Sequence, residues 1–192
     1  MIDLDFLSVT FSTFTLTALA EIGDKSQLVC MTLACRYTHW PVLLGASAAF
    51  LVLNTLAVLF GASISAWIPE QILAIVVSVL FAVFGLQMFR NNDEDDEVIQ
   101  DVTGTNIFLT SFMLIAASEF GDKTQLTVAA LSTSYSPIPV WFGASIGLIM
   151  ISALGVIAGR TILQKISISL LHKLSGGLFL VFAGIAAYRA VS

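Results

Sequence analysis

Charged residues are scarce in this sequence, and their scarcity excludes a water-soluble globular protein. Only 11% of the 192 residues are charged, 57% are hydrophobic and the mean hydropathy is +0.94, whereas a soluble domain carries about 25% charged residues. No stretch is polar enough to form a soluble domain, and no G-x-x-x-x-G-K-[ST] loop occurs. These absences exclude an ATP-driven pump that carries its own nucleotide-binding domain.

Cysteine and histidine are also rare. Cys30 and Cys35 lie in an apolar segment without C-x-x-C spacing, and we interpret both as small core residues. His39 and His172 lie near the ends of apolar segments, where we interpret them as ordinary interfacial residues. The sequence therefore lacks the thiolate and imidazole clusters that favour Zn²⁺ or Cu⁺.

What the sequence has in abundance is long apolar segments, each of sufficient length to cross a bilayer. They cover residues 6–36, 42–66, 71–89, 105–134, 138–163 and 168–188. Backbone groups in hydrocarbon must be hydrogen-bonded internally, and these segments do not alternate with a period of two, so they predict helices rather than a barrel. The N-terminus carries Asp3 and Asp5 where a signal peptide would be basic, so we expect the first segment to be retained. The predicted fold class is an all-α integral membrane protein with six transmembrane helices.

The sequence also contains an internal repeat. A shift of about 98 residues superposes Glu21, Gly23, Asp24, Lys25 and Gln27 on Glu119, Gly121, Asp122, Lys123 and Gln125. The match extends to Pro41, Gly45 and Phe81, which fall on Pro139, Gly143 and Phe179. We therefore predict two three-helix repeats, residues 1–90 and 104–192, joined by an acidic linker over residues 91–103.

Three helices in each repeat is an odd number, so the second repeat should enter the membrane from the opposite side. Inverted repeats of this kind are typical of secondary transporters. The basic residues agree with this topology: Arg36, Arg90, Arg160, Lys165 and Lys173 belong to loops on one side, and Arg189 lies on the other. Because cytoplasmic loops are enriched in Lys and Arg, we predict a cytoplasmic linker and both termini outside the cytoplasm.

Six ionisable residues lie within the predicted first and fourth spans. They are Glu21, Asp24, Lys25, Glu119, Asp122 and Lys123. A charge at this depth costs at least about 2.5–3.5 kcal/mol on insertion scales and usually marks an ion or substrate path. Ion pairs that only hold helices together are the alternative interpretation, but such pairs would not require the same motif in both repeats.

Helical spacing predicts how these residues are arranged. Positions i, i+3 and i+4 share one helix face, so we expect Glu21, Asp24 and Lys25 to point together, and their counterparts in the second repeat likewise. Inversion would bring the two faces together near the membrane midplane. Gly23 and Gly121 weaken the helix inside each motif, and a local break there would expose backbone carbonyls as further ligands.

The chemistry of this predicted pocket favours a hard divalent cation. The predicted ligands all offer oxygen atoms: Glu21, Asp24, Glu119, Asp122, Gln27, Gln125, Ser26 and Thr124. Such ligands suit Mg²⁺, Ca²⁺ and Mn²⁺. Four carboxylates and two ammonium groups leave two formal negative charges, which one divalent ion or two protons would neutralise. We assign the same four acids to proton coupling and expect Lys25 and Lys123 to compensate charge when the pocket is empty, each by bridging an acid of its own or the facing motif.

These motifs carry a resemblance. EIGDKS, from Glu21 to Ser26, and EFGDKT, from Glu119 to Thr124, resemble the paired E-x-G-D-[KR]-[TS] motifs of the Golgi-type calcium/manganese:proton exchangers and their bacterial manganese-exporting relatives. The similarity covers essentially the whole chain, including the acidic central loop. It implies transport of Mn²⁺ or Ca²⁺ against protons, with the motif acids as binding groups, and the short chain resembles the branch of the bacterial plasma (inner) membrane.

We therefore predict a secondary transporter, not an enzyme, that exports Mn²⁺ in exchange for protons. Its expected partners are a divalent metal ion, protons and the lipid bilayer; we expect no cofactor and no nucleic acid, and leave a homodimer open. Two other functions stay open: a passive divalent-cation channel, and an exporter of small organic cations or amino acids. Lys25 and Lys123 argue against the channel, because fixed positive charges oppose cation conduction.

Overall fold

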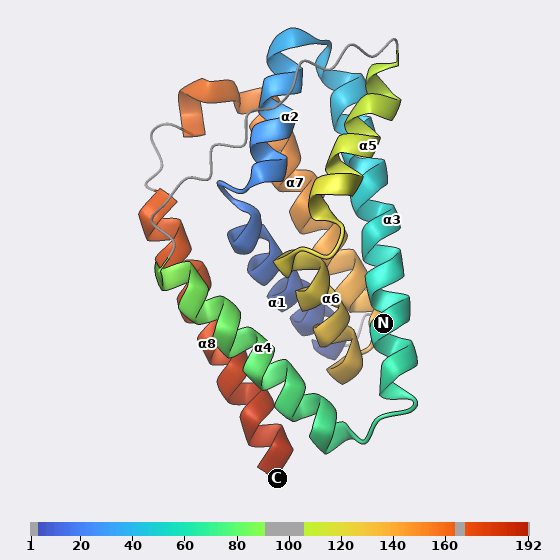
Figure 1. Cartoon of the computed structure of the whole chain (residues 1–192), viewed down its shortest axis with the longest axis vertical. Helices are drawn as coiled ribbons and strands as arrows, with labels where there is room; N and C mark the ends of the chain where they lie inside the picture. Colours follow the sequence, from blue (N-terminus) through green and yellow to red (C-terminus); the bar gives the residue numbers. More distant parts are fainter. Residues whose placement is uncertain (1–3, 91–105, 164–167, 192) are drawn as a thin grey trace.

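The computed structural model describes residues 4–90, 106–163 and 168–191, and these residues form α-helices without any strand (Figure 1). The helices are α1 (Leu4–Glu21), α2 (Lys25–Arg36), α3 (His39–Ser65), α4 (Glu70–Arg90), α5 (Ile107–Glu119), α6 (Lys123–Ser134), α7 (Pro137–Leu163) and α8 (Ile168–Val191). The predicted all-α class is confirmed. Most of the predicted linker lies outside the described residues.

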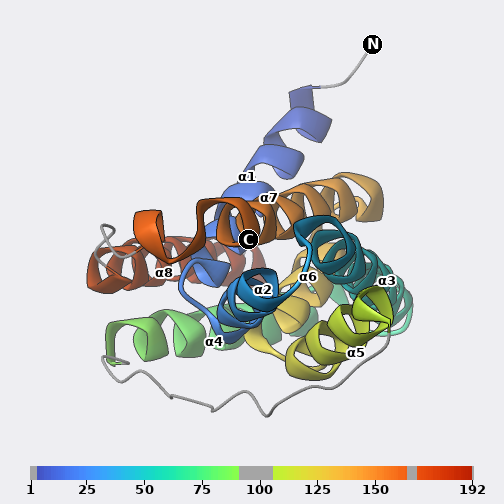
Figure 2. The same cartoon turned by 90° about the horizontal axis from the view of Figure 1, so that it is seen from above.

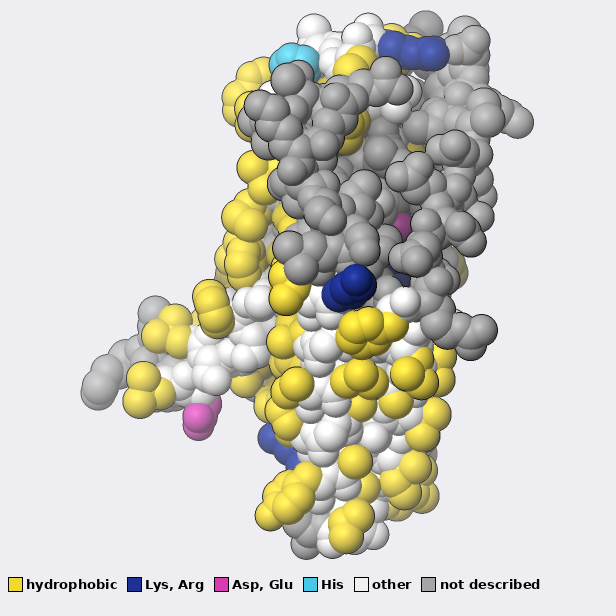
Figure 3. All heavy atoms as spheres, turned by 90° about the vertical axis from the view of Figure 1, so that its left-hand side faces the viewer, with side chains coloured by type: hydrophobic (Ala, Val, Ile, Leu, Met, Phe, Trp, Pro, Cys, Tyr) yellow, Lys and Arg dark blue, Asp and Glu magenta, His cyan; other side chains and the backbone are white. Residues whose placement is uncertain are grey.

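Four of these helices, α3, α4, α7 and α8, are long and apolar enough to cross a membrane. Their outer surfaces are apolar as well: on α4, Ile72, Val79 and Leu86 are each more than half exposed. Figure 3 shows hydrophobic side chains spread over much of the described surface of one face. An apolar surface of this extent suits a hydrocarbon environment, because water would make it an aggregation site.

The apolar segments 6–36 and 105–134 are each divided into two helices. In the first, α1 ends at Glu21 and α2 begins at Lys25; in the second, α5 ends at Glu119 and α6 begins at Lys123. Gly23 and Gly121 lie in the breaks with φ of +82° and +80°, a conformation that other residues rarely adopt. A Cβ on Gly121 would meet nothing within 4 Å, so conformation rather than space requires glycine there. The expected break at these glycines is confirmed.

The break corrects one prediction. Glu21, Asp24 and Lys25 do not lie on one face of a continuous helix, because the positive φ at Gly23 ends α1 before α2 begins. With a rise of 1.5 Å per residue, the 13 residues of α5 and the 12 of α6 extend only about 20 and 18 Å. Neither helix is long enough to cross a hydrocarbon core of about 30 Å alone.

The broken segments pack against the long helices, α1 on α7 and α5 on α3. Both contacts depend on a glycine. A Cβ on Gly143 would lie 2.4 Å from the Thr10 carbonyl oxygen, and a Cβ on Gly45 would lie 2.4 Å from the Phe108 carbonyl oxygen. Gly45 and Gly143 are 98 residues apart, and so are Thr10 and Phe108. The two halves of the chain therefore use matching residues to approach each other.

Helices α4 and α8 form a separate pair at one side of the molecule (Figures 1 and 2). Their contact also exchanges matching residues: the Phe81 and Phe182 rings lie 6.0 Å apart, and the Phe84 and Phe179 rings 5.8 Å apart. The two contacts are equivalent under the repeat: Phe81 corresponds to Phe179 and Phe84 corresponds to Phe182, 98 residues apart in each case. The pair touches the remaining helices mainly through α1 and α6.

The two cysteines differ in burial. Cys30 is fully buried among apolar residues of α2, α3 and α5, as predicted. Cys35 is exposed, so its interpretation as a core residue is wrong. It lies in the last turn of α2, beside the exposed Arg36.

The glycine contacts generate a stability prediction. Gly143→Ala should push α1 away from α7 and destabilise the protein by about 1–3 kcal/mol, the usual cost of overpacking. Gly184→Ala is the matched control, because a Cβ there meets nothing within 4 Å. The thermal midpoint in detergent, followed by size-exclusion chromatography, should fall for Gly143→Ala only. Equal midpoints would contradict this account of the α1–α7 contact.

Candidate cation site

Polar residues beside the two helix breaks meet at the buried carboxyl group of Glu21. Glu21 is fully buried at the C-terminal end of α1. One of its oxygens, Oε2, accepts a hydrogen bond of 3.0 Å from the Thr124 hydroxyl, and the other, Oε1, accepts one from the Ser26 hydroxyl. Ser26 and Thr124 occupy the same position in the two motifs. The structure therefore brings residues of both motifs onto one buried carboxyl group, as the sequence predicts.

A second link between the motifs is ionic. The Lys123 ammonium group, at the start of α6, pairs with Asp24 in the break between α1 and α2. The side chains of Lys123 and Asp24 are 25% and 17% exposed, so the pair lies nearer the surface than Glu21. Of the two alternatives predicted for this lysine, the structure adopts the bridge to the facing motif. The side chain of Lys25 lies outside the described residues.

Glu119 ends α5 and is also buried, with an exposed fraction of 5%. It lines a cavity of about 10 Å³ together with Phe50, Leu53, Asn54, Thr124, Gln125 and Leu148. Glu119 interacts electrostatically with Glu21, Asp24 and Asp122, and Lys123 interacts with Glu21, Asp24 and Asp122. The four predicted acids therefore form one electrostatic cluster together with Lys123.

Gln27 and Gln125 hold the breaks in shape. The Gln27 amide oxygen accepts a 2.7 Å hydrogen bond from the Gly23 N–H, and the Gln125 amide oxygen accepts a 2.5 Å bond from the Gly121 N–H. Their amide nitrogens reach the Ile151 and Leu53 carbonyl oxygens, each at 3.4 Å. These bonds recur at matched positions in both motifs. In this structure the two glutamines position the motifs, and their role as metal ligands stays a prediction.

The ends of the short helices add to the electrostatics of the site. The last carbonyl groups of a helix have no intrahelical partner and carry partial negative charge, which favours a cation. Helices α1 and α5 both end at a motif glutamate, so two such ends lie at the site. Helices α2 and α6 begin there, and the adverse effect of a lysine at the positive start of α6 is offset by Asp24.

No group of three His, Cys, Asp or Glu side chains within the described residues is arranged closely enough to hold a metal ion. Three interactions engage the acids instead: the Ser26 and Thr124 hydroxyls donate hydrogen bonds to Glu21, and Lys123 forms an ion pair with Asp24. The carboxyl groups of Glu21 and Asp24 are thus already engaged by hydroxyl and ammonium groups of the protein.

Sequence reasoning did not identify Asn54, which lines the Glu119 cavity from α3. Its side chain is 2% exposed and its amide nitrogen donates a 3.1 Å hydrogen bond to the Ser145 hydroxyl on α7. A single carboxamide in the middle of an apolar segment was the signal that could have revealed it, because buried polar groups in membrane helices are costly.

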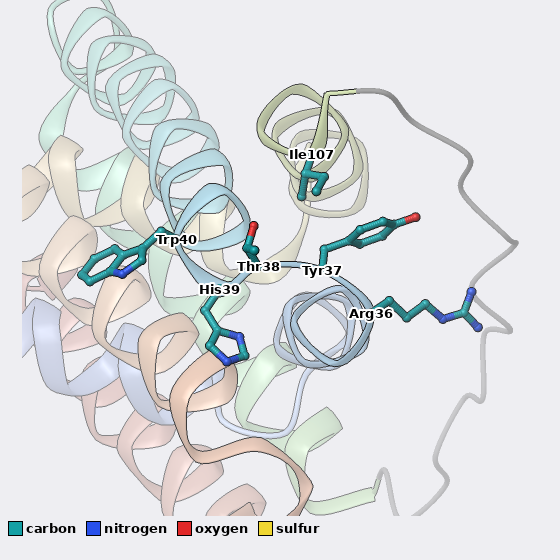
Figure 4. A pocket seen from close by; sticks show the side chains of 6 residues that line it. All are labelled: Arg36, Tyr37, Thr38, His39, Trp40 and Ile107. Atoms are coloured by element: carbon teal, nitrogen blue, oxygen red, sulfur yellow. The ribbon is translucent and has the colours of Figure 1, made fainter.

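A larger open pocket of about 640 Å³ lies where α2 ends and α3 and α5 begin (Figure 4). It is lined by Arg36, Tyr37, Thr38, His39, Trp40 and Ile107, and it includes no motif residue. The side chains of Arg36, His39 and Trp40 point in different directions in Figure 4 rather than toward a common centre. His39 is exposed, and its interpretation as an interfacial residue stays a prediction; the His172 side chain lies outside the described residues.

Comparisons with known proteins agree with the motif resemblance. The family model described as "Divalent cation/proton antiporter GDT1" matches residues 9–96 and 107–192. A Vibrio cholerae protein named "Putative manganese exporter" is 30% identical over 185 residues, which cover 95% of this chain and 92% of that protein. The GDT1-like protein 3 of Arabidopsis thaliana is 30% identical, covering 90% of this chain and 68% of that protein.

The similarity therefore extends over both halves of the chain, including both motifs. No solved structure matches. The members of the matched family are transporters rather than enzymes, and the apolar helices place the chain in a membrane. The chain belongs to the GDT1 family of divalent cation/proton antiporters.

Proposed function

We propose that this antiporter exports Mn²⁺ from the cytoplasm in exchange for protons, with Ca²⁺ as the other candidate substrate. The proposal rests on the buried cluster of motif residues. In it, Glu21 accepts hydrogen bonds from hydroxyl groups of both motifs, and Lys123 forms an ion pair with Asp24. Its oxygen ligands suit a hard divalent cation. The relative named as a manganese exporter favours Mn²⁺.

In this proposal Glu21, Asp24, Glu119 and Asp122 bind the metal and carry the exchanged protons. Lys123 takes the place of the cation when the site is empty, because its ammonium group already neutralises Asp24. An arriving divalent ion displaces Lys123 and binds the acids together with the hydroxyl oxygens of Ser26 and Thr124, and it leaves when protons neutralise the acids. Charge at the site then stays balanced in each loaded state, which lowers the cost of carrying the site through hydrocarbon.

We also propose that the chain forms six membrane spans in two inverted repeats, residues 1–90 and 104–192. Two spans would be the broken pairs α1–α2 and α5–α6, and the others would be α3, α4, α7 and α8. The reciprocal contacts at Gly45 and Gly143 and within the α4–α8 pair support a two-fold relation between the halves. Discontinuous helices near the midplane are typical of such transporters.

The proposed location is a bacterial plasma membrane, with the linker cytoplasmic and both termini outside the cytoplasm. The last residue of α2, Arg36, and the last turn of α8, which holds Arg189, lie at opposite ends of the molecule (Figure 1). That separation supports the unequal distribution of basic residues on which the orientation rests. A homodimer stays a prediction.

The glutamate roles can be tested in proteoliposomes. Glu119→Gln and Glu21→Gln each keep the side-chain shape but remove one titratable group, so either change should abolish Mn²⁺ uptake driven by a pH gradient. Glu70→Gln is the matched control, because Glu70 is exposed at the start of α4 and outside the site. Uptake by either motif variant at the wild-type rate, with intact proton coupling, would show that the glutamate is not a required carrier.

The role of Lys123 has a different signature. If its ammonium group replaces the cation in the empty site, Lys123→Gln should slow net proton-driven uptake about tenfold or more while Mn²⁺/Mn²⁺ exchange, in which the site changes sides only with metal bound, continues. Lys173→Gln, an exposed lysine on α8, is the control. Loss of Mn²⁺ affinity with unchanged exchange per bound ion would refute this role.

The orientation predicts which side of the membrane each loop faces. In a background of Cys30→Ala and Cys35→Ser, a cysteine at Asp95 should react with an impermeant maleimide only from the cytoplasm. A cysteine added after Ser192 should react only from outside. Labelling of both sites from one side would overturn the inverted topology.

A further inference from the structure

The residue at the centre of this inference is Asn54, a polar side chain in the middle of the long apolar helix α3. Burying an amide without partners costs about 1–3 kcal/mol by protein mutational data, and Asn54 is only 2% exposed. Its amide nitrogen has a partner, because it donates a 3.1 Å hydrogen bond to the Ser145 hydroxyl. This bond fixes the orientation of the amide, with its nitrogen toward α7 and its carbonyl oxygen away from Ser145.

Asn54 lines the small cavity beside Glu119. Two other polar residues of the lining are engaged elsewhere: the Thr124 hydroxyl donates to Glu21, and the Gln125 amide oxygen accepts from the Gly121 N–H. The lining residues that still offer oxygen lone pairs are Asn54 through its carbonyl oxygen, Glu119 through its carboxyl group and Thr124 through its hydroxyl oxygen. Its volume of about 10 Å³ is close to the smallest space that holds one water molecule.

This feature occurs in one half of the chain only. The motif contacts recur after 98 residues, but the position that matches Asn54 is Ser152, and the position that matches Ser145 is Ser47. Ser152 is also buried, and its hydroxyl is hydrogen-bonded to the Cys30 thiol. The fold therefore accepts a small hydroxyl at this position, so packing alone does not require asparagine in α3.

We propose that Asn54 is a ligand of the transported cation at Glu119 and a determinant of which divalent ion is transported, with Ser145 as its positioning residue. The inference rests on the proposed function and adds a neutral oxygen ligand outside the motifs. A small cavity with a fixed amide suits a small, hard cation. Ca²⁺ binds at 2.3–2.6 Å and takes six to eight oxygen ligands, so the site should favour Mn²⁺ over Ca²⁺.

The test compares Asn54→Ala, Ser145→Ala and the matched control Ser152→Ala in proteoliposomes, with initial uptake of Mn²⁺ and of Ca²⁺ driven by a pH gradient. We expect Asn54→Ala to raise the KM for Mn²⁺ about tenfold or more and to lower the preference for Mn²⁺ over Ca²⁺. Ser145→Ala should shift both quantities in the same direction by less. Ser152→Ala should leave both unchanged.

A purely structural role predicts a different result. If Asn54 only joins α3 to α7, Asn54→Ala should lower the thermal midpoint and the maximal rate, with unchanged KM and ion preference, and the proposal is then wrong. Binding of Mn²⁺ to the detergent-solubilised protein, measured by electron paramagnetic resonance, needs no transport. If the wild type binds Mn²⁺ but does not exchange it for protons, the proposed function fails, and weaker binding by Asn54→Ala would still support the ligand role. Equal binding by the two proteins would overturn it.

Discussion

The cost of burying carboxyl groups among apolar helices is the constraint on which this structure depends. Glu21 is fully buried and accepts hydrogen bonds from the hydroxyl groups of Ser26 and Thr124. Asp24 forms an ion pair with the ammonium group of Lys123. Thr124 and Lys123 belong to the other motif. The second half of the chain therefore supplies partners that lower the cost of burying two acids of the first half, so these acids depend on contact between the halves.

Three features of the fold bring the two motifs together. Glycines with positive φ end α1 and α5 at their glutamates and start new helices at Lys25 and Lys123. Gln27 and Gln125 fasten the breaks to α7 and α3. Gly45 and Gly143 allow the broken segments to approach those helices to backbone contact. The proposed binding site and the contacts that shape the fold thus use neighbouring residues, and under this proposal a cation that enters competes with protein groups already in place.

Much of this arrangement follows from the sequence, and the exceptions have physical reasons. Apolar segments and a repeated motif were sufficient to predict an all-α membrane protein, the break at Gly23 and Gly121, and the meeting of the motif residues. The prediction that Glu21 and Asp24 share one helix face was wrong, because the i, i+3 and i+4 spacing of a continuous helix does not hold across a break. The choice of Asp24 as the partner of Lys123, and the place of Asn54 beside Glu119, depend on how distant helices pack. Periodicity within one segment carries no information about that packing.

The central claim is that metal and protons compete for one set of carboxyl groups. The most direct measurement is the pH change of a weakly buffered solution of the detergent-solubilised protein when Mn²⁺ is added. This account predicts that protons are released as Mn²⁺ binds, and that the apparent affinity for Mn²⁺ falls as the pH is lowered. Saturating Mn²⁺ binding without proton release, and with an affinity independent of pH, would contradict it.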